Sequence, residues 1–513
     1  MKIPFEGEWI NNWLSARTRI APDFLAILDE SGGVERRFTV RDLENRASRA
    51  ASFLLDKGVA EGDVICALSW PRVEVLDLLF ACSKLGAIFF PFNTRLASPE
   101  IEELLRQVKP KVFFYEEEFS ENALSADVPI LVHSGFDNVS GSFSYRELMT
   151  NDVSLRVIAD VELEDPLMML QTGGTTGKPK IAKVNYRMIL WNAVNTVRDL
   201  IIPYDTTITA VPLYHIGGFT YTIPLLFWGG TNILMPRWDV NLYLDLVQRE
   251  RPTFLFLVPS QLKTMIDSPK FQTTDFSSVR FLTAGGAALT SEMIKAVFEK
   301  GITQKQGYGM TEMGPGIFAL DPLDGYNYMG SIGKPNILVE AKVVRSDGSE
   351  AGPNESGELL LRGPSVFGGY WNNEIETCET FEEGWLKTGD IVLRTNDGYF
   401  YVIGRTKNII RSGSESIFPE EVEKLLQSHP AVAEALVIGI PDPKWGEVPK
   451  ALIVVRKTMN VSVENLYTFC ADKIAKYKIP KYFEFVPGIP KDSMGKTSRV
   501  RLAQLFGEQK DQE

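Results

Sequence analysis

Residues 41–58, RDLENRASRAASFLLDKG, and residues 63–68, DVICAL, decide the fold class of this chain. In the first stretch, small and aliphatic residues recur every three to four positions, which predicts an amphipathic helix that ends at Gly58. The second stretch is a short apolar run and predicts a buried strand. The alternation continues with expected elements at 71–85 (helix), 87–92 (strand), from Ser98 (helix) and at 111–115 (strand). Repeated alternation of this kind is typical of a layered α/β domain.

The later part of the chain predicts two further units. Short apolar runs separated by Gly, Asn and Asp turns indicate a β-rich subdomain at 357–363, 390–394 and 398–404. After residue 404 helical and strand patterns mix again. We therefore expect a large N-terminal domain, residues 1–404, of layered α/β subdomains plus the β-rich subdomain. A small, mobile α+β domain, residues 405–513, follows it and has a common domain size.

The composition excludes several classes of partner. The 513 residues include 54 Lys and Arg against 66 Asp and Glu, a net charge of −12. This charge repels phosphate backbones and anionic lipid, so neither a nucleic acid nor a membrane surface is expected as the primary partner. Any bound anion must be held by local groups.

Cysteine and histidine usage points to a reducing compartment and away from a zinc site. The four cysteines form no CxxC pair and the three histidines are far apart, so neither a disulfide framework nor a local zinc centre is expected. Glu6 and Glu8 stand where a signal peptide needs an apolar run, so we expect a cytoplasmic protein.

Residues 206–236 contain no charged side chain over a length that exceeds a membrane-spanning helix. Pro212, Pro224 and pairs of glycines interrupt the stretch, so it predicts buried strands and short helices, with a loop that lines a pocket, rather than a transmembrane segment.

The strongest local signal is residues 171–180, QTGGTTGKPK. Glycines let a backbone approach an anion closely, hydroxyls donate hydrogen bonds, and lysines add charge. The loop is not a Walker A motif, because Pro179 follows Lys178 where that motif has Ser or Thr. The stretch predicts a phosphate-binding loop, with a Gly-rich surface turn as the alternative. Its candidate contacts are Thr172, Gly173, Gly174, Thr175, Thr176, Gly177, Lys178 and Lys180.

With this loop, four further motifs resemble, in the same order, those of the superfamily of AMP-forming acyl-CoA synthetases, most closely its fatty-acid and aryl-acid CoA ligases. They are QGYGMTE (306–312), GWLKTGD (384–390), GRTKNII (404–410) and PKDSMGK (490–496). Weaker matches lie at 211–218, 284–289 and 357–363. Chance agreement at so many ordered positions is negligible.

The resemblance implies that ATP, with Mg²⁺, activates a carboxylic acid as acyl-AMP, and that CoA then accepts the acyl group. Lys496 would supply positive charge where the carboxylate meets the α-phosphate. Glu312, beside Thr311, would hold Mg²⁺ together with Thr176, in keeping with that ion's preference for one or two carboxylates plus phosphate oxygens. The nucleotide contacts implied are Gly286, Ala287, Ala288, Tyr308 and Gly309 at the adenine and pocket wall, and Asp390 and Arg405 at the ribose.

The resemblance also implies an acyl pocket and a hinge. His215 resembles the family's gate at the acyl pocket, and Gly217 and Gly218 follow it in an apolar stretch that favours an aliphatic or aryl acid. The small domain would rotate at Lys407 between the two steps. Ser412, Gly413 and Ser414 would border the path of the CoA thiol.

Several positions depart from the family's usual pattern, and alternatives remain. Gly173 stands where Ser is common, and Ser414 where Gly is common, so a Cβ at Ser414 would hinder a positive φ there. The first alternative is therefore a stand-alone adenylating enzyme that loads a separate carrier protein. A regulator that binds nucleotide without catalysis and a luciferase-like oxygenase are further alternatives. The sequence predicts no oligomeric state.

Overall fold

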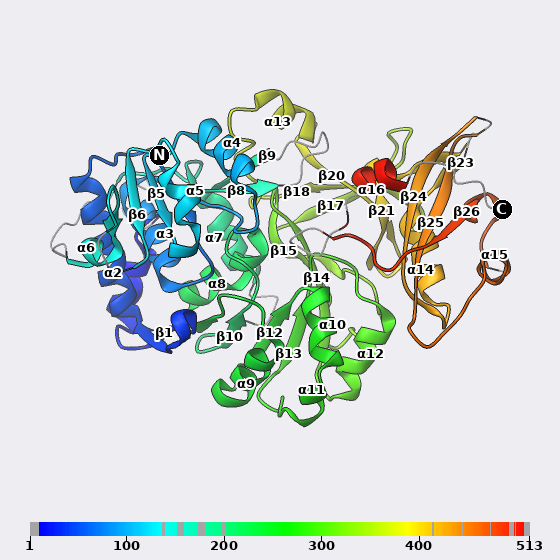
Figure 1. Cartoon of the computed structure of the whole chain (residues 1–513), viewed down its shortest axis with the longest axis horizontal. Helices are drawn as coiled ribbons and strands as arrows, with labels where there is room; N and C mark the ends of the chain where they lie inside the picture. The colour runs from blue at the N-terminus through cyan, green and yellow to red at the C-terminus, as the bar shows by residue number, and fades with distance from the viewer. Residues whose placement is uncertain are drawn as a thin grey trace, which may run out of the picture. The chain divides into compact units, whose positions relative to one another are not determined.

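The computed structural model describes residues 10–135, 139–150, 159–172, 180–196, 201–412, 415–443, 445–471, 473–491, 497 and 499–506. The chain divides into two compact units (Figure 1). Met1–Glu340 and Leu361–Leu386 form the first, and Ala341–Leu360 and Lys387–Glu513 form the second. Lys407 lies in a 3₁₀ turn (Thr406–Asn408) of the second unit, and its role as a hinge, like the boundary near 404–407, stays a prediction.

The first unit begins with a seven-stranded sheet whose order is β7-β6-β5-β3-β4-β8-β9. Its strands are β7 (Phe143–Ser144), β6 (Ile130–His133), β5 (Val112–Tyr115), β3 (Val64–Leu68), β4 (Ile88–Pro91), β8 (Pro166–Thr172) and β9 (Lys180–Asn185). All neighbouring pairs are parallel except β8 and β9. The predicted α/β alternation is confirmed, because α2 (Val40–Asp56), α3 (Val73–Leu85) and α4 (Ser98–Val108) lie where the sequence places helices.

Two smaller sheets contain the strands that lie in or next to the predicted acyl and adenine motifs. One has the order β10-β11-β1-β2, with β10 (Thr206–Thr209), β11 (Thr231–Leu234), β1 (Leu25–Asp29) and β2 (Arg36–Thr39). The other has the order β12-β13-β14-β15-β16, with β12 (Phe254–Leu257), β13 (Phe281–Ala284), β14 (Gln304–Met310), β15 (Gly314–Ala319) and β16 (Lys334–Pro335). Figure 1 shows α9 (Val240–Glu250), α10 (Pro259–Asp267), α11 (Pro269–Thr273) and α12 (Ser291–Glu299) beside β12 and β13. A shared cluster of buried aliphatic and aromatic side chains joins these helices to both sheets.

The remaining helices of the first unit connect or flank these sheets. They are α1 (Trp13–Ile20), α5 (Ser120–Leu124), α6 (Tyr145–Thr150), α7 (Tyr186–Asn195), α8 (Ile216–Trp228) and α13 (Glu374–Thr380).

The uncharged stretch 206–236 forms β10, α8 and β11, as buried elements. Pro224 lies inside α8 instead of ending it. A proline removes one backbone donor, but α8 is buried along most of its length, so packing retains the helix. No helix within the described ranges is long and apolar enough to cross a membrane.

A further sheet has the order β17-β18-β20-β19, with β21 beside β20, and the division between the units passes through β18 and β20. Its strands are β17 (Glu340–Val344), β18 (Ser356–Arg362), β19 (Phe381–Glu382), β20 (Trp385–Arg394) and β21 (Phe400–Arg405). The last sheet contains β22 (Ile410–Ser412), β23 (Glu415–Ile417), β24 (Val432–Asp442), β25 (Gly446–Val455) and β26 (Tyr482–Phe485).

The sequence of strand β24 is apolar almost without interruption, because both faces of the strand are buried. Ala435 and Val437 pack with α14 (Pro419–Gln427) and α15 (Val463–Ala471) on one face. Leu436 and Ile438 pack with Leu502 of α16 (Arg499–Phe506) on the other. Because helices cover both faces of the sheet, alternate residues on both sides must be apolar.

A buried cluster of charges lies where β1, β2 and α3 meet in the first unit. The Glu74 carboxylate, 3% exposed, lies 2.7 Å from Arg36 Nη1, 2.7 Å from Arg72 Nε and 3.7 Å from Arg46 Nη2. Burial opposes ionisation of this carboxyl, but the hydrogen bond from Arg36 and the charges of the three arginines outweigh it. Together they lower the pKa of Glu74 to about 2.

Replacing Glu74 with glutamine should destabilise the first unit by about 3–5 kcal/mol, because three guanidinium groups lose their shared buried anion. A depressed carboxyl pKa contributes stability above the unfolded value of 4.5, and this contribution is lost as the pH falls toward 2. Urea denaturation measures the free energy of unfolding. The difference in this free energy between wild type and Glu74→Gln should therefore become smaller from pH 6 to pH 3. The control is Glu35→Gln, which removes partly exposed ion pairs with Arg37 and Arg249 and should cost less than about 1 kcal/mol. Equal losses in the two variants would contradict the role of the cluster.

Candidate active site

The glycine motifs of the first unit meet at the carboxyl ends of parallel strands. Strands β12, β13 and β14 are parallel, so Gly285, directly after β13, lies beside Gly307 of β14. A Cβ added to Gly285 would lie 3.2 Å from the Gly307 carbonyl oxygen, and Gly286 has a φ of +88°. Ala287 and Ala288 continue this segment and are exposed, like Gly286. The result is a wall of bare backbone and methyl groups, which a flat ligand could approach closely.

The hairpin of β14 and β15 fixes the predicted adenine-stacking residue. The ring of Tyr308 meets Phe318 edge to face, with centroids 5.6 Å apart. At Gly309 a Cβ would lie 2.7 Å from Pro315 Cα, so only glycine fits there. The hairpin therefore holds Tyr308 on a rigid backbone, and its contact with adenine stays a prediction.

Glu312 follows β14 in the turn after Thr311 and is half-buried. The hydroxyl of Tyr370 donates a hydrogen bond to Glu312 Oε1 at 2.8 Å. The N–H of Phe367 donates to the Glu312 carbonyl oxygen at 2.9 Å. One segment, far away in sequence, thus holds both the backbone and the carboxylate of the predicted metal ligand.

Thr172 and Lys180 are the described ends of the predicted phosphate loop. Lys180 forms an ion pair with Glu376, and its Nζ lies 4.9 Å from the centre of the Tyr370 ring. Among the described residues, the Oγ1 atom of Thr172 is buried and finds no hydrogen-bond partner. A buried hydroxyl in this state is costly unless a ligand or water satisfies it, which fits the end of an anion-binding loop.

The donor set around Glu312 fits magnesium rather than a transition metal. Within the described part of the chain, no group of three or more His, Cys, Asp and Glu side chains could hold a metal ion. Magnesium needs no such cage, because it is commonly held by one or two carboxylates together with the substrate's phosphates and waters. Glu312 can supply that carboxylate. Thr176, the second predicted ligand, lies outside the described residues.

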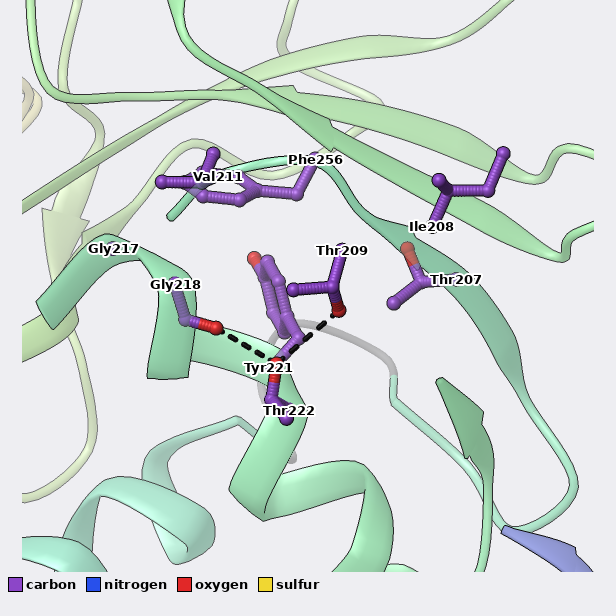
Figure 2. Close-up of a pocket in the computed structure, with 9 residues that line it drawn as sticks. All are labelled: Thr207, Ile208, Thr209, Val211, Gly217, Gly218, Tyr221, Thr222 and Phe256. Atoms are coloured by element: carbon purple, nitrogen blue, oxygen red, sulfur yellow. Dashed lines mark hydrogen bonds between the residues drawn. The ribbon is translucent and has the colours of Figure 1, made fainter. Parts of the chain in front are cut away.

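Figure 2 shows a small cavity at the start of α8, on the predicted acyl side of the site. It has room for about 10 Å³, close to one water molecule. Gly217 and Gly218 border it, as do Val211, Tyr221 and Phe256, with Thr207, Ile208, Thr209 and Thr222 on the remaining sides. The lining includes Gly217 and Gly218 but not His215.

The threonine hydroxyls of this cavity form hydrogen bonds within the protein. Thr222 Oγ1 donates to the Gly218 carbonyl oxygen at 2.7 Å and lies 3.2 Å from Thr209 Oγ1 (Figure 2). A Cβ on Gly218 would lie 2.3 Å from the Pro212 carbonyl oxygen, so glycine is required for this tight turn. His215 caps the amino end of α8 and packs against Tyr214, with ring centroids 4.5 Å apart. Its gating role stays a prediction.

The predicted ribose contacts form a pair within the second unit. Asp390 of β20 is directly opposite Arg405 of β21, and Arg405 Nε lies 2.6 Å from Asp390 Oδ1. Asp390 is 2% exposed, and its N–H donates to Thr388 Oγ1 at 3.0 Å. Ser412 ends β22 opposite Glu415 of β23. Of the other predicted site residues, Gly173, Gly174, Thr175, Gly177, Lys178, Gly413, Ser414 and Lys496 lie outside the described residues.

Three residues in contact with these predicted positions were missed by the sequence reasoning. Tyr370 and Glu376 hold Glu312 and Lys180, and Phe256 lines the cavity. The contact of Tyr370 with Glu312 joins positions 58 residues apart, so no local pattern marks Tyr370. Nothing local marks Glu376 or Phe256.

Comparisons with known proteins agree with this arrangement. The profile described as AMP-binding enzyme matches residues 14–371, and that of the AMP-binding enzyme C-terminal domain matches residues 421–496. An indoleacetate–CoA ligase of Aromatoleum aromaticum is 35% identical over 508 residues, which cover 97% of this chain and 98% of the relative. A feruloyl-CoA synthase of an Amycolatopsis species is 33% identical over 98% of this chain and 100% of the relative. The chain belongs to the AMP-binding enzyme family.

A solved structure is similar over nearly the whole chain. The o-succinylbenzoate CoA synthetase of Bacillus subtilis, in complex with its acyl-adenylate intermediate, has a TM-score of 0.84 and 31% identity, and covers 96% of this chain and 98% of its own. The same enzyme has been solved with ATP and a magnesium ion. The predictions of the α/β fold, of an AMP-forming acid–CoA ligase, and of ATP, Mg²⁺ and CoA as its cofactor and cosubstrates are confirmed.

Proposed function

We propose that this ligase acts on an aromatic carboxylic acid, which it activates with ATP and transfers to CoA. We infer an aromatic acid from the lining of the cavity next to Gly217 and Gly218. This lining includes Tyr221 and Phe256 and contains no charged residue. Aromatic rings pack favourably edge to face against such a wall. An acid with a second charge would find no partner there.

The depth of the site also favours an aryl acid over a long fatty acid. The cavity next to the two glycines has room for about one water molecule, so an alkyl chain does not fit into it. The relatives named above act on indoleacetate and on the aromatic acid of feruloyl-CoA, as their names state. Both observations support a compact, flat acyl group.

In the first step, a carboxylate oxygen of the acid attacks the α-phosphorus of ATP and the bond to the β-phosphate breaks, which releases pyrophosphate. Lys496 would stand at this centre and balance the charge that builds up on it. Glu312 would hold Mg²⁺, which supplies positive charge to the phosphates when bound. Asp390 and Arg405 would orient the ribose, and the ring of Tyr308 would lie against adenine.

In the second step, the sulfur of CoA attacks the acyl carbon, the bond from that carbon to the AMP oxygen breaks, and AMP leaves. We place the thiol path along Ser412, Gly413 and Ser414, and the rotation between the steps at Lys407. The relatives named above are a CoA ligase and a CoA synthase, which favours CoA over a carrier protein as the acceptor. The chain's four cysteines are all free thiols, with Cys66 and Cys82 buried, which favours a reducing compartment such as the cytoplasm.

The test is release of AMP and pyrophosphate with a panel of acids, each with and without CoA. The panel contains indole-3-acetate, ferulate, benzoate, hexanoate and palmitate. We expect CoA-dependent turnover with an aromatic acid at a kcat/KM at least about tenfold above that with either fatty acid, which corresponds to about 1.4 kcal/mol. Faster turnover with palmitate would overturn the acid class. Pyrophosphate release that stops near one equivalent would favour a carrier protein, and no release with any acid would favour the regulator.

A further inference from the structure

One segment between β18 and α13 fixes the predicted metal carboxylate from two directions. The Tyr370 hydroxyl donates to Glu312 Oε1 at 2.8 Å, and the Phe367 N–H donates to the Glu312 carbonyl oxygen at 2.9 Å. Glu312 lies 58 positions before Tyr370 in the chain. Two bonds from one segment define both the position of the backbone and the orientation of the carboxylate.

Tyr370 is itself held on all sides, so its hydroxyl can aim the carboxylate. It is 6% exposed, and its ring meets Phe367 edge to face at 4.9 Å. Its N–H donates to Thr377 Oγ1 at 2.9 Å. The backbone beside it pairs with β9, where the Trp371 N–H donates to the Ile181 carbonyl oxygen at 2.7 Å. A side chain with so few alternative conformations loses little conformational entropy when it makes a hydrogen bond.

The hydroxyl remains a donor under working conditions. An ordinary tyrosine phenol has a pKa of about 10 and so carries its proton near neutral pH. The phenol therefore stays protonated, and its one proton is directed at Glu312 Oε1. The other carboxylate oxygen, Oε2, has no hydrogen-bond partner among the described residues.

The same ring also touches the end of the phosphate loop. Lys180 Nζ lies 4.9 Å from the centre of the Tyr370 ring and forms an ion pair with Glu376 of α13. The lysine is thus occupied by protein groups, because a cation is attracted to the face of an aromatic ring. Tyr370 contacts both the residue that ends the loop and the carboxylate predicted to bind the metal.

We propose that Tyr370 is the positioning residue of Glu312, because it occupies Oε1 and leaves Oε2 to the magnesium ion of the nucleotide. The inference rests on the proposed function, in which Glu312 binds that ion. Hydrogen-bond partners that orient a metal-binding side chain affect metal affinity about 10–100-fold when removed. Tyr370 acts through Glu312.

The experiment compares wild type with Tyr370→Phe, which keeps the ring and its contacts with Phe367 and Lys180 but removes the donor. The probe is Mn²⁺ titrated into protein saturated with α,β-methylene-ATP, followed by electron paramagnetic resonance. We expect the Kd for Mn²⁺ to rise about tenfold in Tyr370→Phe, and binding of the nucleotide analogue in EDTA to stay unchanged. In a Glu312→Gln background, Tyr370→Phe should cause no additional loss, because the two residues act through one contact.

The matched control is Tyr186→Phe. The Tyr186 hydroxyl is also buried and donates to the Ser83 carbonyl oxygen at 3.3 Å, so this variant loses a comparable bond away from Glu312. Its Mn²⁺ affinity should equal that of wild type. Equal Mn²⁺ affinity in Tyr370→Phe and wild type would overturn the inference about Tyr370 but not the proposed function. Additive losses with Glu312→Gln would do the same, whereas a wild type without metal-dependent analogue binding would overturn the proposed function as well.

Discussion

Replacing Lys496 with alanine is expected to slow acyl-AMP formation about a hundred- to a thousandfold while ATP binding is largely retained. The acid and the α-phosphate are both anionic, so the transition state gathers negative charge that a cation at this point stabilises. A group that acts mainly in the transition state affects kcat far more than substrate affinity. The measurement is single-turnover formation of acyl-AMP, with nucleotide binding followed by calorimetry.

The control is Lys491→Ala, which removes the same charge from the same sequence motif. Lys491 forms an ion pair with Glu434 at 2.6 Å, and both side chains are substantially exposed, so its loss should have little effect. If the small domain withdraws Lys496 after the first step, Lys496→Ala should still convert synthetic acyl-AMP and CoA to acyl-CoA at the wild-type rate. Comparable adenylation rates in Lys496→Ala and wild type would refute the assigned role.

Replacing Asp390 with asparagine is expected to raise the KM for ATP about 10–100-fold. Hydrogen bonds to a charged group contribute about 1.5–3 kcal/mol, and a buried carboxylate can accept from both ribose hydroxyls. Asp390 is held in position to accept these hydrogen bonds, because Thr388 fixes its backbone and Arg405 orients its Oδ1. The substitution keeps the shape of the side chain and removes the charge.

Discrimination against 2′,3′-dideoxy-ATP separates a ribose contact from a structural ion pair. Wild type should prefer ATP strongly over the dideoxy nucleotide, and Asp390→Asn should lose most of that preference. A structural ion pair with Arg405 would instead lower the activity on both nucleotides equally. The control is Asp397→Asn in the exposed turn after β20, which should leave both KM values unchanged.

The sequence was most informative where local patterning decides structure. The helix at Val40–Asp56 and the strand at Val64–Leu68 lie within two residues of their expected positions, because an amphipathic period or an apolar run follows from burial alone. Pro224 was misjudged as a break, since the packing that retains α8 comes from distant segments. The strand at Val432–Asp442 is apolar on both faces because helices cover both.

In the candidate site, too, residues within local motifs were predicted from the sequence and residues that depend on distant contacts were not. Gly286, Gly309 and Asp390 were predicted from short motifs, because a close backbone approach or a fixed turn restricts residue type locally. Tyr370 was not found, since its relation to Glu312 depends on pairing of its segment with β9. Lys180 was expected to contribute charge to the phosphate loop, yet its ion-pair partner Glu376 lies 196 residues further on. Contacts of such separation are set by the tertiary fold and leave no local sequence signal.

The central claim is that one chain joins an aromatic acid to CoA through an acyl-AMP. The most direct test uses an acid with both carboxylate oxygens labelled with ¹⁸O, turned over with ATP, Mg²⁺ and CoA, and mass spectrometry of the products. Attack of the carboxylate on the α-phosphorus, followed by cleavage of the acyl carbon–oxygen bond, predicts one ¹⁸O in each AMP, one in each acyl-CoA and none in pyrophosphate. Unlabelled AMP, or label in inorganic phosphate, would contradict the account.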